Sequence, residues 1–415
     1  MTNSETKNFS QNVSSSYHLE DRGKCNKNTR THTRNVPKLR FKGYNDKWKK
    51  VKLKDICIDF IVPMRDKPKK FNGNIPWCRI EDIEGNYFNG TKSNQYVSHE
   101  TIDAMNLKII PTGSVICSCS ASLGTYAINT RPIITNQTFI GLVCSDAISN
   151  HFLLNLMNTQ TKKLRIIAGG TTIPYISREK FEEYDIKIPN KSEQEKIASF
   201  LTLIDKKIEK QKELVEILKK YKRGLLSAIF SQKMRFKDDN GKDYPAWEER
   251  YIQDVCSITT GKGNTQDKED NGVYPFYVRS PIVEKSNKYI FDGEAVLTVG
   301  DGVGTGKVFH YVNGKFNFHQ RVYKMSDFSG INGKYFYYYF STHFYNRVKR
   351  MTAKTSVDSV RMDMIAKMPI FIPANAEQDK IIDLLTNVEN IFLKNENLLL
   401  LLQEYKKGLL QQMFI

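Results

Sequence analysis

The sequence lacks the motifs that mark most nucleotide- and cofactor-dependent enzymes. It contains no Walker A loop, no glycine-rich strand-to-helix fingerprint for a dinucleotide or S-adenosylmethionine, and no Asn-Pro-Pro-aromatic methyltransferase motif. The seven histidines are scattered without metal-ligand spacing. We therefore expect no catalytic residues, no metal site and no cofactor bound by this chain itself.

Long apolar runs and paired cysteines are also missing. No apolar stretch is long enough to span a membrane, and Met1 is followed by polar sequence, so we expect a cytoplasmic protein. The cysteine count is odd and no C-x-x-C pair occurs, which predicts reduced thiols in the core. These cysteines are Cys25, Cys57, Cys78, Cys117, Cys119, Cys144 and Cys256. Cys117 and Cys119 alternate along a probable strand, which indicates packing rather than zinc binding.

What the chain does contain is a large apolar fraction and an excess of basic residues. Its 415 residues are 40% hydrophobic, enough for two or three domains with their own cores. The formal charge is +18, which favours an anionic partner such as nucleic acid through counterion release. Residues 1–36 are rich in Ser, Asn, Thr and Lys, which predicts a disordered or loosely docked arm.

The chain is an internal duplication. Residues 186–230 reappear as residues 370–414 without a gap, and 18 of the 45 aligned positions are identical. Average composition gives about one match in fifteen. Function therefore depends on two copies of one unit.

The duplication continues upstream through landmarks whose offset drifts. Leu39-Arg40-Phe41 matches Met234-Arg235-Phe236, and a Trp is followed seven residues later by Asp in both halves. Ile75-Pro76-Trp77 corresponds to Tyr274-Pro275-Phe276, and Asn136-Gln137 to His319-Gln320. Since the residues between these landmarks diverge, we expect one fold that carries two different surfaces.

The repeated segments are expected to be long helices over residues 192–232 and 375–413. Capping boxes are predicted at Ser192 with Glu195 and at Asn375 with Gln378, after strands that end before Pro189 and Pro373. Apolar positions then alternate by four and three, which predicts a coiled-coil seam. The seam comprises Ile197, Leu201, Ile204, Ile208, Gln211, Val215, Leu218, Lys222, Leu225 and Ile229, and in the second copy Ile381, Leu385, Val388, Phe392, Asn395, Leu399, Leu402, Lys406, Leu409 and Met413.

Two polar positions interrupt each seam at the same places. Gln211 and Asn395 lie near the middle of their helices, and the middles meet when two helices pair antiparallel. A hydrogen bond between them would fix the register. The alternative is that each side chain tolerates solvent at a helix bend.

Two mixed segments, about residues 44–185 and 244–369, complete the chain. Short β-rich runs, such as 114–118, 139–144, 295–299 and 307–312, alternate with Gly, Asn and Pro turns, and amphipathic helices are expected over 152–167 and 335–351. The aromatic run Tyr335–Phe340 suggests base stacking, but its counterpart Phe152–Leu156 is mostly aliphatic. Helix packing is therefore the preferred interpretation.

Polar side chains recur at matched places in these segments. The run Gly300–Lys307 is not a phosphate loop, because Asp301 stands where that loop needs glycine and Val308 follows the lysine. Its counterpart, Ser120–Tyr126, shows that the shared element is a glycine-containing turn with variable side chains, where recognition residues belong. Arg suits guanine, and Asn or Gln suits adenine. The candidate DNA-binding residues are Arg79, Ser120, Ser122, Tyr126, Asn136, Gln137, Arg279, Asp301, Thr305, Lys307, His319, Gln320 and Arg321; the alternative for each is an exposed or structural polar residue.

This pattern resembles the specificity subunit of Type I restriction-modification enzymes. Three features carry the resemblance: the Leu/Met-Arg-Phe…Trp-x6-Asp opening of each half, the Pro-x3-Glu-Gln entry into each long helix, and the Tyr-Lys-(Arg/Lys)-Gly-Leu-Leu helix ending at 221–226 and 405–410. The resemblance covers residues 37–415. Residues 1–36 depart from it, being longer than the usual start of such chains.

The resemblance implies an α+β fold with two mixed α/β target recognition domains, joined by two long helices in an antiparallel coiled coil with pseudo-two-fold duplication. The boundaries expected are an arm at 1–36, recognition domains at 37–190 and 236–373, and spacer helices at 191–235 and 374–415. The residues expected to pair the two helices are Ile197, Leu201, Ile204, Ile208, Gln211, Leu218, Ile381, Leu385, Val388, Phe392, Asn395 and Leu402.

The resemblance also implies a non-catalytic DNA reader with a split, asymmetric target. Two methyltransferase subunits that use S-adenosylmethionine would methylate adenine, and two restriction subunits would translocate and cut DNA with ATP and magnesium. The alternative from another class is a coiled-coil interaction scaffold with two ligand-binding domains that do not touch DNA. Lys and Arg gathered on the concave face of both mixed domains would favour the reader.

Overall fold

The computed structural model describes residues 36–120, 122–169, 174–302, 304–352 and 359–415. Cys25 and almost all of the expected N-terminal arm lie outside these residues. The chain divides into two compact units: the described residues up to Thr202 together with Lys406–Ile415, and Leu203–Tyr405. The bounds of the five predicted segments therefore remain a prediction, because each long helix contributes residues to both units.

The first unit contains a six-stranded sheet, a three-stranded sheet and a two-stranded ladder, with orders β2-β10-β7-β8-β5-β4, β6-β3-β9 and β1-β11. Helix α3 packs against β7 and β8. The elements are β1 (Lys49–Lys52), β2 (Cys57–Ile61), β3 (Ile75–Cys78), β4 (Ile83–Glu84), β5 (Tyr87–Phe88), β6 (Tyr96–Val97), α2 (His99–Met105), β7 (Val115–Ser118), β8 (Tyr126–Asn129), β9 (Ile134–Thr135), β10 (Phe139–Cys144), α3 (Asn150–Ile167), α4 (Arg178–Glu182), β11 (Asp185–Ile188) and the start of α5 (Lys191–Phe230).

The second unit repeats this plan with a six-stranded sheet of order β13-β18-β16-β17-β14-β15 and a ladder β12-β19. Here α6 covers β16 and β17. The elements are β12 (Glu248–Tyr251), β13 (Ser257–Thr260), β14 (Tyr274–Tyr277), β15 (Val283–Ser286), β16 (Phe291–Val299), β17 (Phe309–Phe318), β18 (Val322–Ser326), α6 (Gly333–Thr352), α7 (Met362–Ala366), β19 (Pro369–Ile372) and α8 (Asn375–Met413). The predicted strands and amphipathic helices are confirmed within a few residues.

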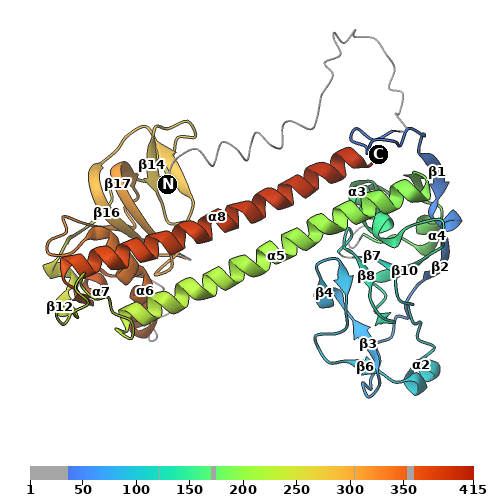
Figure 1. Cartoon of the computed structure of the whole chain (residues 1–415), viewed down its shortest axis with the longest axis horizontal. Helices are drawn as coiled ribbons and strands as arrows, with labels where there is room; N and C mark the ends of the chain where they lie inside the picture. Colours follow the sequence, from blue (N-terminus) through green and yellow to red (C-terminus); the bar gives the residue numbers. More distant parts are fainter. Residues whose placement is uncertain (1–35, 121, 170–173, 303, 353–358) are drawn as a thin grey trace, which may run out of the picture. The chain divides into compact units, whose positions relative to one another are not determined.

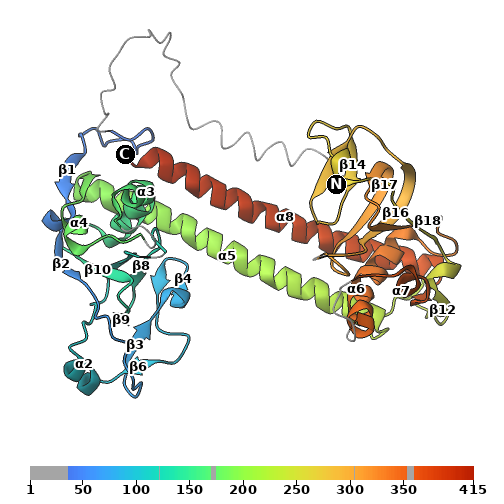
Figure 2. The same ribbon diagram turned by 180° about the vertical axis from the view of Figure 1, so that it is seen from behind.

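The antiparallel pairing of α5 and α8 is also confirmed, and the two helices run side by side in both views (Figure 1, Figure 2). None of the predicted seam residues is exposed. Gln211 Nε2 donates to Asn395 Oδ1 at 3.0 Å and to the Asn395 carbonyl at 2.9 Å, as an antiparallel register requires. The second polar position, Lys222, pairs across the helices with Glu389 at 2.7 Å, and Tyr338 donates to the same carboxylate at 2.9 Å.

The predicted capping boxes are wrong. Helix α5 begins at Lys191, and the side chain that caps it is Asn190, whose Oδ1 accepts from the Glu193 amide at 3.0 Å. Ser192 is exposed and contacts the Tyr44 hydroxyl. At α8 the backbone carbonyl of Ala374 accepts the first helical amides instead. The boxes fail because both helices begin earlier than the pattern predicts, so the residues before their first turns are Asn190 and Ala374, and alanine has no side-chain acceptor.

The Glu-Gln pair at each helix entry has a structural role. Gln194 Nε2 donates to the Pro189 carbonyl at 3.1 Å, and its Oε1 accepts from the Ser149 amide at 3.0 Å. Gln378 repeats this with the Pro373 carbonyl at 3.0 Å and the Asn332 amide at 2.8 Å. Each glutamine therefore ties a long helix to the helix that covers the sheet.

The glutamate of each pair is wholly buried and holds the arginine of the opening motif. Arg40 donates to both carboxylate oxygens of Glu193 at 2.7 Å, and Arg235 donates to those of Glu377 at 3.1 and 2.6 Å. These bidentate pairs close each unit around the start of its long helix. They explain why both motifs recur in both halves.

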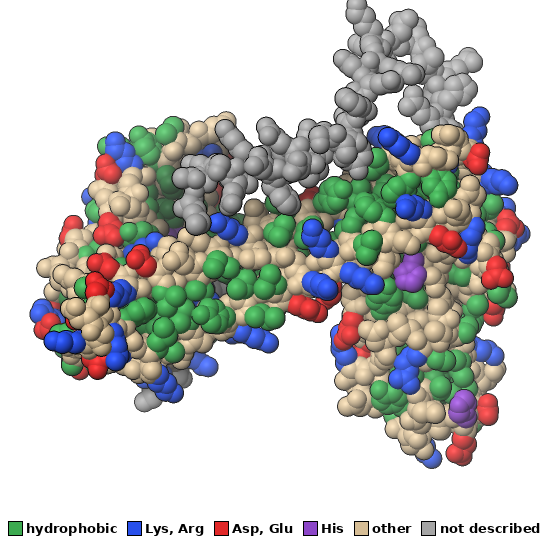
Figure 3. All heavy atoms as spheres, viewed as in Figure 1, with side chains coloured by type: hydrophobic (Ala, Val, Ile, Leu, Met, Phe, Trp, Pro, Cys, Tyr) green, Lys and Arg blue, Asp and Glu red, His purple; other side chains and the backbone are tan. Residues whose placement is uncertain are grey.

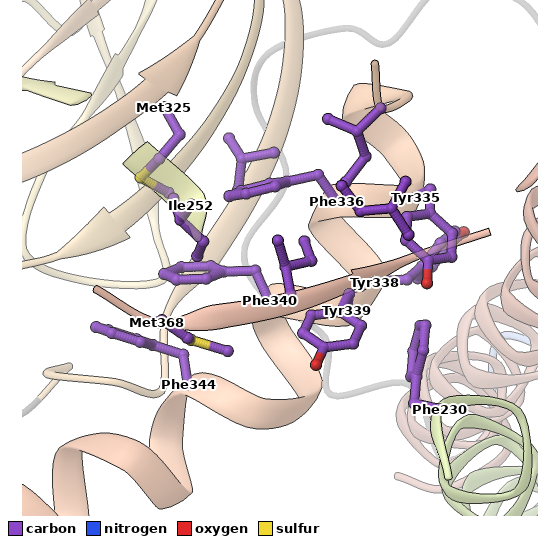
Figure 4. Close-up of a cluster of buried hydrophobic side chains, with 14 of the residues drawn as sticks. Phe230, Ile252, Met325, Tyr335, Phe336, Tyr338, Tyr339, Phe340, Phe344 and Met368 are labelled. Carbon is purple, nitrogen blue, oxygen red and sulfur yellow. The ribbon is translucent and has the colours of Figure 1, made fainter. Parts of the chain in front are cut away.

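The aromatic run packs inside the second unit, as predicted. Tyr335, Phe336 and Phe340 are fully buried in α6, and Phe230 from α5 lies edge-on to Tyr339 with ring centroids 5.2 Å apart (Figure 4). None of these rings is available for base stacking.

The six described cysteines are free thiols, five of them buried, which confirms the packing interpretation for them. Burial raises the pKa of Cys78, Cys144 and Cys256 to about 12. These thiols therefore stay protonated and unreactive near neutral pH.

Candidate nucleic-acid interface

A pair of parallel strands brings two of the predicted polar segments together in each unit. In the first unit β3 pairs with β9, with Cys78 opposite Thr135, so Arg79 and Asn136 leave neighbouring strands at the same edge. In the second unit β14 pairs with β17, with Tyr277 opposite Phe318. The His319 amide donates to the Tyr277 carbonyl at 2.9 Å, which places it beside the segment that carries Arg279.

The glycine-containing turn reaches the same place. After β7, the Cys119 amide donates to the Thr138 carbonyl at 2.8 Å. After β16, the Gly300 amide donates to the Arg321 carbonyl at 2.8 Å. A Cβ on Gly304 would lie 3.0 Å from the Arg279 carbonyl oxygen, so the absence of a side chain permits close packing there. Strand ends and turn therefore form one three-part site in each unit.

In the second unit the exposed members carry charge. Asp301 lies between Arg279 and Arg321, whose guanidinium nitrogens are each 3.6 Å from one of its carboxylate oxygens. Gln320 is exposed beside Arg321 in the turn between β17 and β18, and the exposed Lys307 extends over the Tyr345 ring at 5.6 Å. These groups can donate several hydrogen bonds to an anionic or acceptor-rich ligand.

In the first unit the side chains at the corresponding site are mostly neutral. Arg79 donates to Gln95 Oε1 at 2.6 Å and lies 3.6 Å from a Glu81 oxygen. Asn136 Oδ1 accepts from the Thr138 hydroxyl at 2.5 Å, and this bond does not use the amide hydrogens of Asn136. Two further predicted residues, Gln137 and Ser122, are exposed, and Ser120 is half-buried with its backbone paired to Tyr175.

Three predicted residues do not present their side chains at the surface. Tyr126 is buried and accepts a hydrogen bond from Thr161 at 3.3 Å. Thr305 is buried and its hydroxyl donates to the Gly302 carbonyl at 2.6 Å. His319 is buried, its Nδ1 accepts from the Arg321 amide at 3.0 Å, and burial with nearby Arg279 lowers its pKa. For these three the geometry favours the structural alternative, because they shape the turns rather than face a ligand.

Sequence reasoning missed Gln95 and Glu81, the partners of Arg79. Glu81 follows Arg79 by two residues, whereas Gln95 comes from the segment just before β6, 16 residues further along the chain. No local pattern marks Gln95, because its contact depends on how β3 and β6 pair.

Basic side chains are not gathered on the face shown in Figure 3. Among the described residues drawn there, Lys and Arg are interspersed with Asp and Glu over both units. This face therefore does not show the basic clustering expected of a DNA reader.

A family model described as the Type I restriction modification DNA specificity domain matches residues 45–220 and again 245–402. The chain is 27% identical over 245 residues to the Type I restriction enzyme MjaIX specificity subunit of Methanocaldococcus jannaschii. That match covers 55% of this chain and spans little more than half, 56%, of the relative.

Solved structures share the fold. The Type I restriction-modification S subunit from M. genitalium superimposes with a TM-score of 0.64 at 17% identity, over 92% of this chain and 99% of that one. A chain from a structure concerned with complex assembly and conformational transition of the type I R-M system gives a TM-score of 0.54 at 16% identity, over 89% and 98% of the two chains. The recognised architecture is thus two mixed sheet domains with long antiparallel helices.

Proposed function

Because this chain belongs to the Type I restriction-modification DNA specificity family, we propose that each of its two domains reads one half of a bipartite, asymmetric DNA target. The chain itself is the non-catalytic recognition subunit. In this proposal it directs adenine methylation and DNA cleavage by partner subunits, and it works in the cytoplasm, where its DNA target is.

The observation that supports this proposal most directly is the repeated site. The same parallel strand pair and glycine turn occur in both units, yet one site carries Arg79, Gln137 and Ser122 and the other Arg279, Gln320 and Arg321. Two copies of one scaffold with different hydrogen-bonding groups suit two unrelated half-sites, because base edges in the major groove differ in their donor and acceptor pattern. The scaffold alternative, without DNA, offers no reason for these matched polar sites.

Partner subunits are the second part of the proposal. Two methyltransferase subunits with S-adenosylmethionine and two restriction subunits with ATP and magnesium would supply the chemistry. The helices of the second unit expose apolar side chains that suit such docking, including Ile217 (61%), Leu400 (57%) and Leu401 (59%). Among the described residues, no helix is long and apolar enough to cross a membrane.

The test is to sequence methylated adenines in cells that carry the methyltransferase partner with and without this chain. We expect one bipartite motif that requires the chain. A matched pair of variants then assigns the halves: Arg79→Ala should relax only one half-site and Arg279→Ala only the other. Methylation by the isolated chain with S-adenosylmethionine, or no motif that depends on the chain, would contradict the proposal.

A further inference from the structure

Asp301 occupies an unusual place for an acidic residue at a surface meant for DNA. Its side chain is 27% exposed, whereas those of its two neighbours, Arg279 and Arg321, are 52% and 63% exposed. Each arginine approaches a different carboxylate oxygen. An acid can accept a hydrogen bond from the N4 amino group of cytosine, but both carboxylate oxygens of Asp301 already face arginines, and this geometry points to another role.

The backbone around Asp301 is held by two neighbouring segments. The Gly300 amide donates to the Arg321 carbonyl at 2.8 Å, and the Val360 amide donates to the Gly300 carbonyl at 2.7 Å. Asp301 itself forms a β-bridge with Ser359. The carboxylate therefore sits at a defined point, while the long arginine side chains have many rotamers of their own.

We propose that Asp301 is a positioning residue that aligns Arg279 and Arg321 for guanine recognition by the second domain. This inference rests on the proposed function. One carboxylate between two guanidinium groups offsets their mutual repulsion and limits the rotamers of both. At 3.6 Å the two contacts are ion pairs and not hydrogen bonds, so the N–H groups of the two exposed arginines are left for a ligand. A guanidinium fork matches the O6 and N7 acceptors of guanine in the major groove. The half-site read by the second domain should accordingly contain guanine.

The first unit orients its arginine in another way. Arg79 is bonded to the neutral Gln95 at 2.6 Å, and the residue that aligns with Asp301 is Ala121, which lies outside the described residues. An alanine has no carboxylate, so the bridging acid is a property of the second domain. A change at Asp301 should affect one half-site and leave the other as an internal control.

The experiment compares Asp301→Asn with wild type in cells that contain the methyltransferase partner, with methylated adenines sequenced. We expect Asp301→Asn to reduce discrimination at the guanine positions of one half-site by roughly tenfold or more, the order expected for a well-formed bidentate contact. Asp301→Glu, which keeps the charge, should restore part of it. Asp292→Asn, which removes an exposed acid of β16 in the same unit, should leave the motif unchanged.

Several results would overturn the inference while leaving the proposed function intact. One is an unchanged motif in Asp301→Asn; another is a second-domain half-site without guanine. Equal relaxation of both half-sites, or loss of methylation together with a lower melting temperature of purified Asp301→Asn, would show a structural role instead. A wild-type chain that yields no bipartite motif would instead defeat the proposed function itself.

Discussion

Removing Arg235 should destabilise the protein through the carboxylate that it leaves behind. Glu377 is wholly buried and accepts from Arg235 Nε at 3.1 Å, from an Arg235 terminal nitrogen at 2.6 Å and from Trp247 Nε1 at 3.1 Å. Breaking a buried ion pair on one side costs about 3–5 kcal/mol. Because Arg235 is one-quarter exposed and Trp247 still donates, we expect Arg235→Ala to lie near the lower end, about 3 kcal/mol.

The first unit offers a matched comparison. Glu193 is equally buried and is bonded to Arg40 by two hydrogen bonds of 2.7 Å. Among the described residues, the indole nitrogen of Trp48 has no hydrogen-bond partner, so no tryptophan supports this carboxylate. Arg40→Ala should therefore cost more than Arg235→Ala, by about the 1.5–3 kcal/mol of one hydrogen bond to a charged group.

The assay is urea unfolding followed by far-ultraviolet circular dichroism, with the midpoint and slope of each transition compared. Glu377→Gln should recover part of the loss when combined with Arg235→Ala, since no buried charge is then left unpaired. Arg178→Ala removes an exposed ion pair with Glu182 and serves as the control, at about 0–1 kcal/mol. If Arg235→Ala loses no more stability than Arg178→Ala, the buried pairs do not close the units as we argue.

Three further outcomes follow from the structure. Gln211→Ala should destabilise the helix pair by about 0.5–1.5 kcal/mol, the net contribution of a hydrogen bond. The double variant Gln211→Leu with Asn395→Leu should raise the melting temperature but allow other registers of the two helices, which disulfide trapping between the helices would detect. Burial lowers the pKa of His310 and His343 below the ordinary 6.5, so the unfolded state takes up protons first as the pH falls. The free energy of unfolding should therefore decrease as the pH drops below 6.5. His310→Phe should weaken this dependence in melting curves recorded between about pH 7.5 and 5.5. Insertion of one heptad into each helix, beside Gln211 and Asn395, adds about 10 Å and should lengthen the nonspecific spacer of the methylated motif by about three base pairs, whereas an unchanged spacer would show that the helices do not set it.

Much of this architecture was accessible from the sequence because it depends on local periodicity and on repetition. The seams of α5 and α8 repeat every 3.5 residues, and a helix that pairs along such a stripe must bury it, so residues such as Leu201 and Leu385 were predictable. Gln211 and Asn395 could be paired because antiparallel helices of equal length meet at their middles. Comparison with the mostly aliphatic counterpart in the first copy, Phe152–Leu156, identified Tyr335–Phe340 as packing residues.

The tertiary structure alone decided which groups meet at the sites. Arg79 with Gln95, and Asp301 between Arg279 and Arg321, are contacts between segments brought together by strand pairing. No periodic pattern in the sequence predicts these contacts, because each joins two residues that are distant in sequence and meet only when the strands pair. The same reason explains the buried Tyr126 and His319 and the misplaced capping boxes: residue type shows what a side chain can bond, whereas the folded chain determines which partner is within reach.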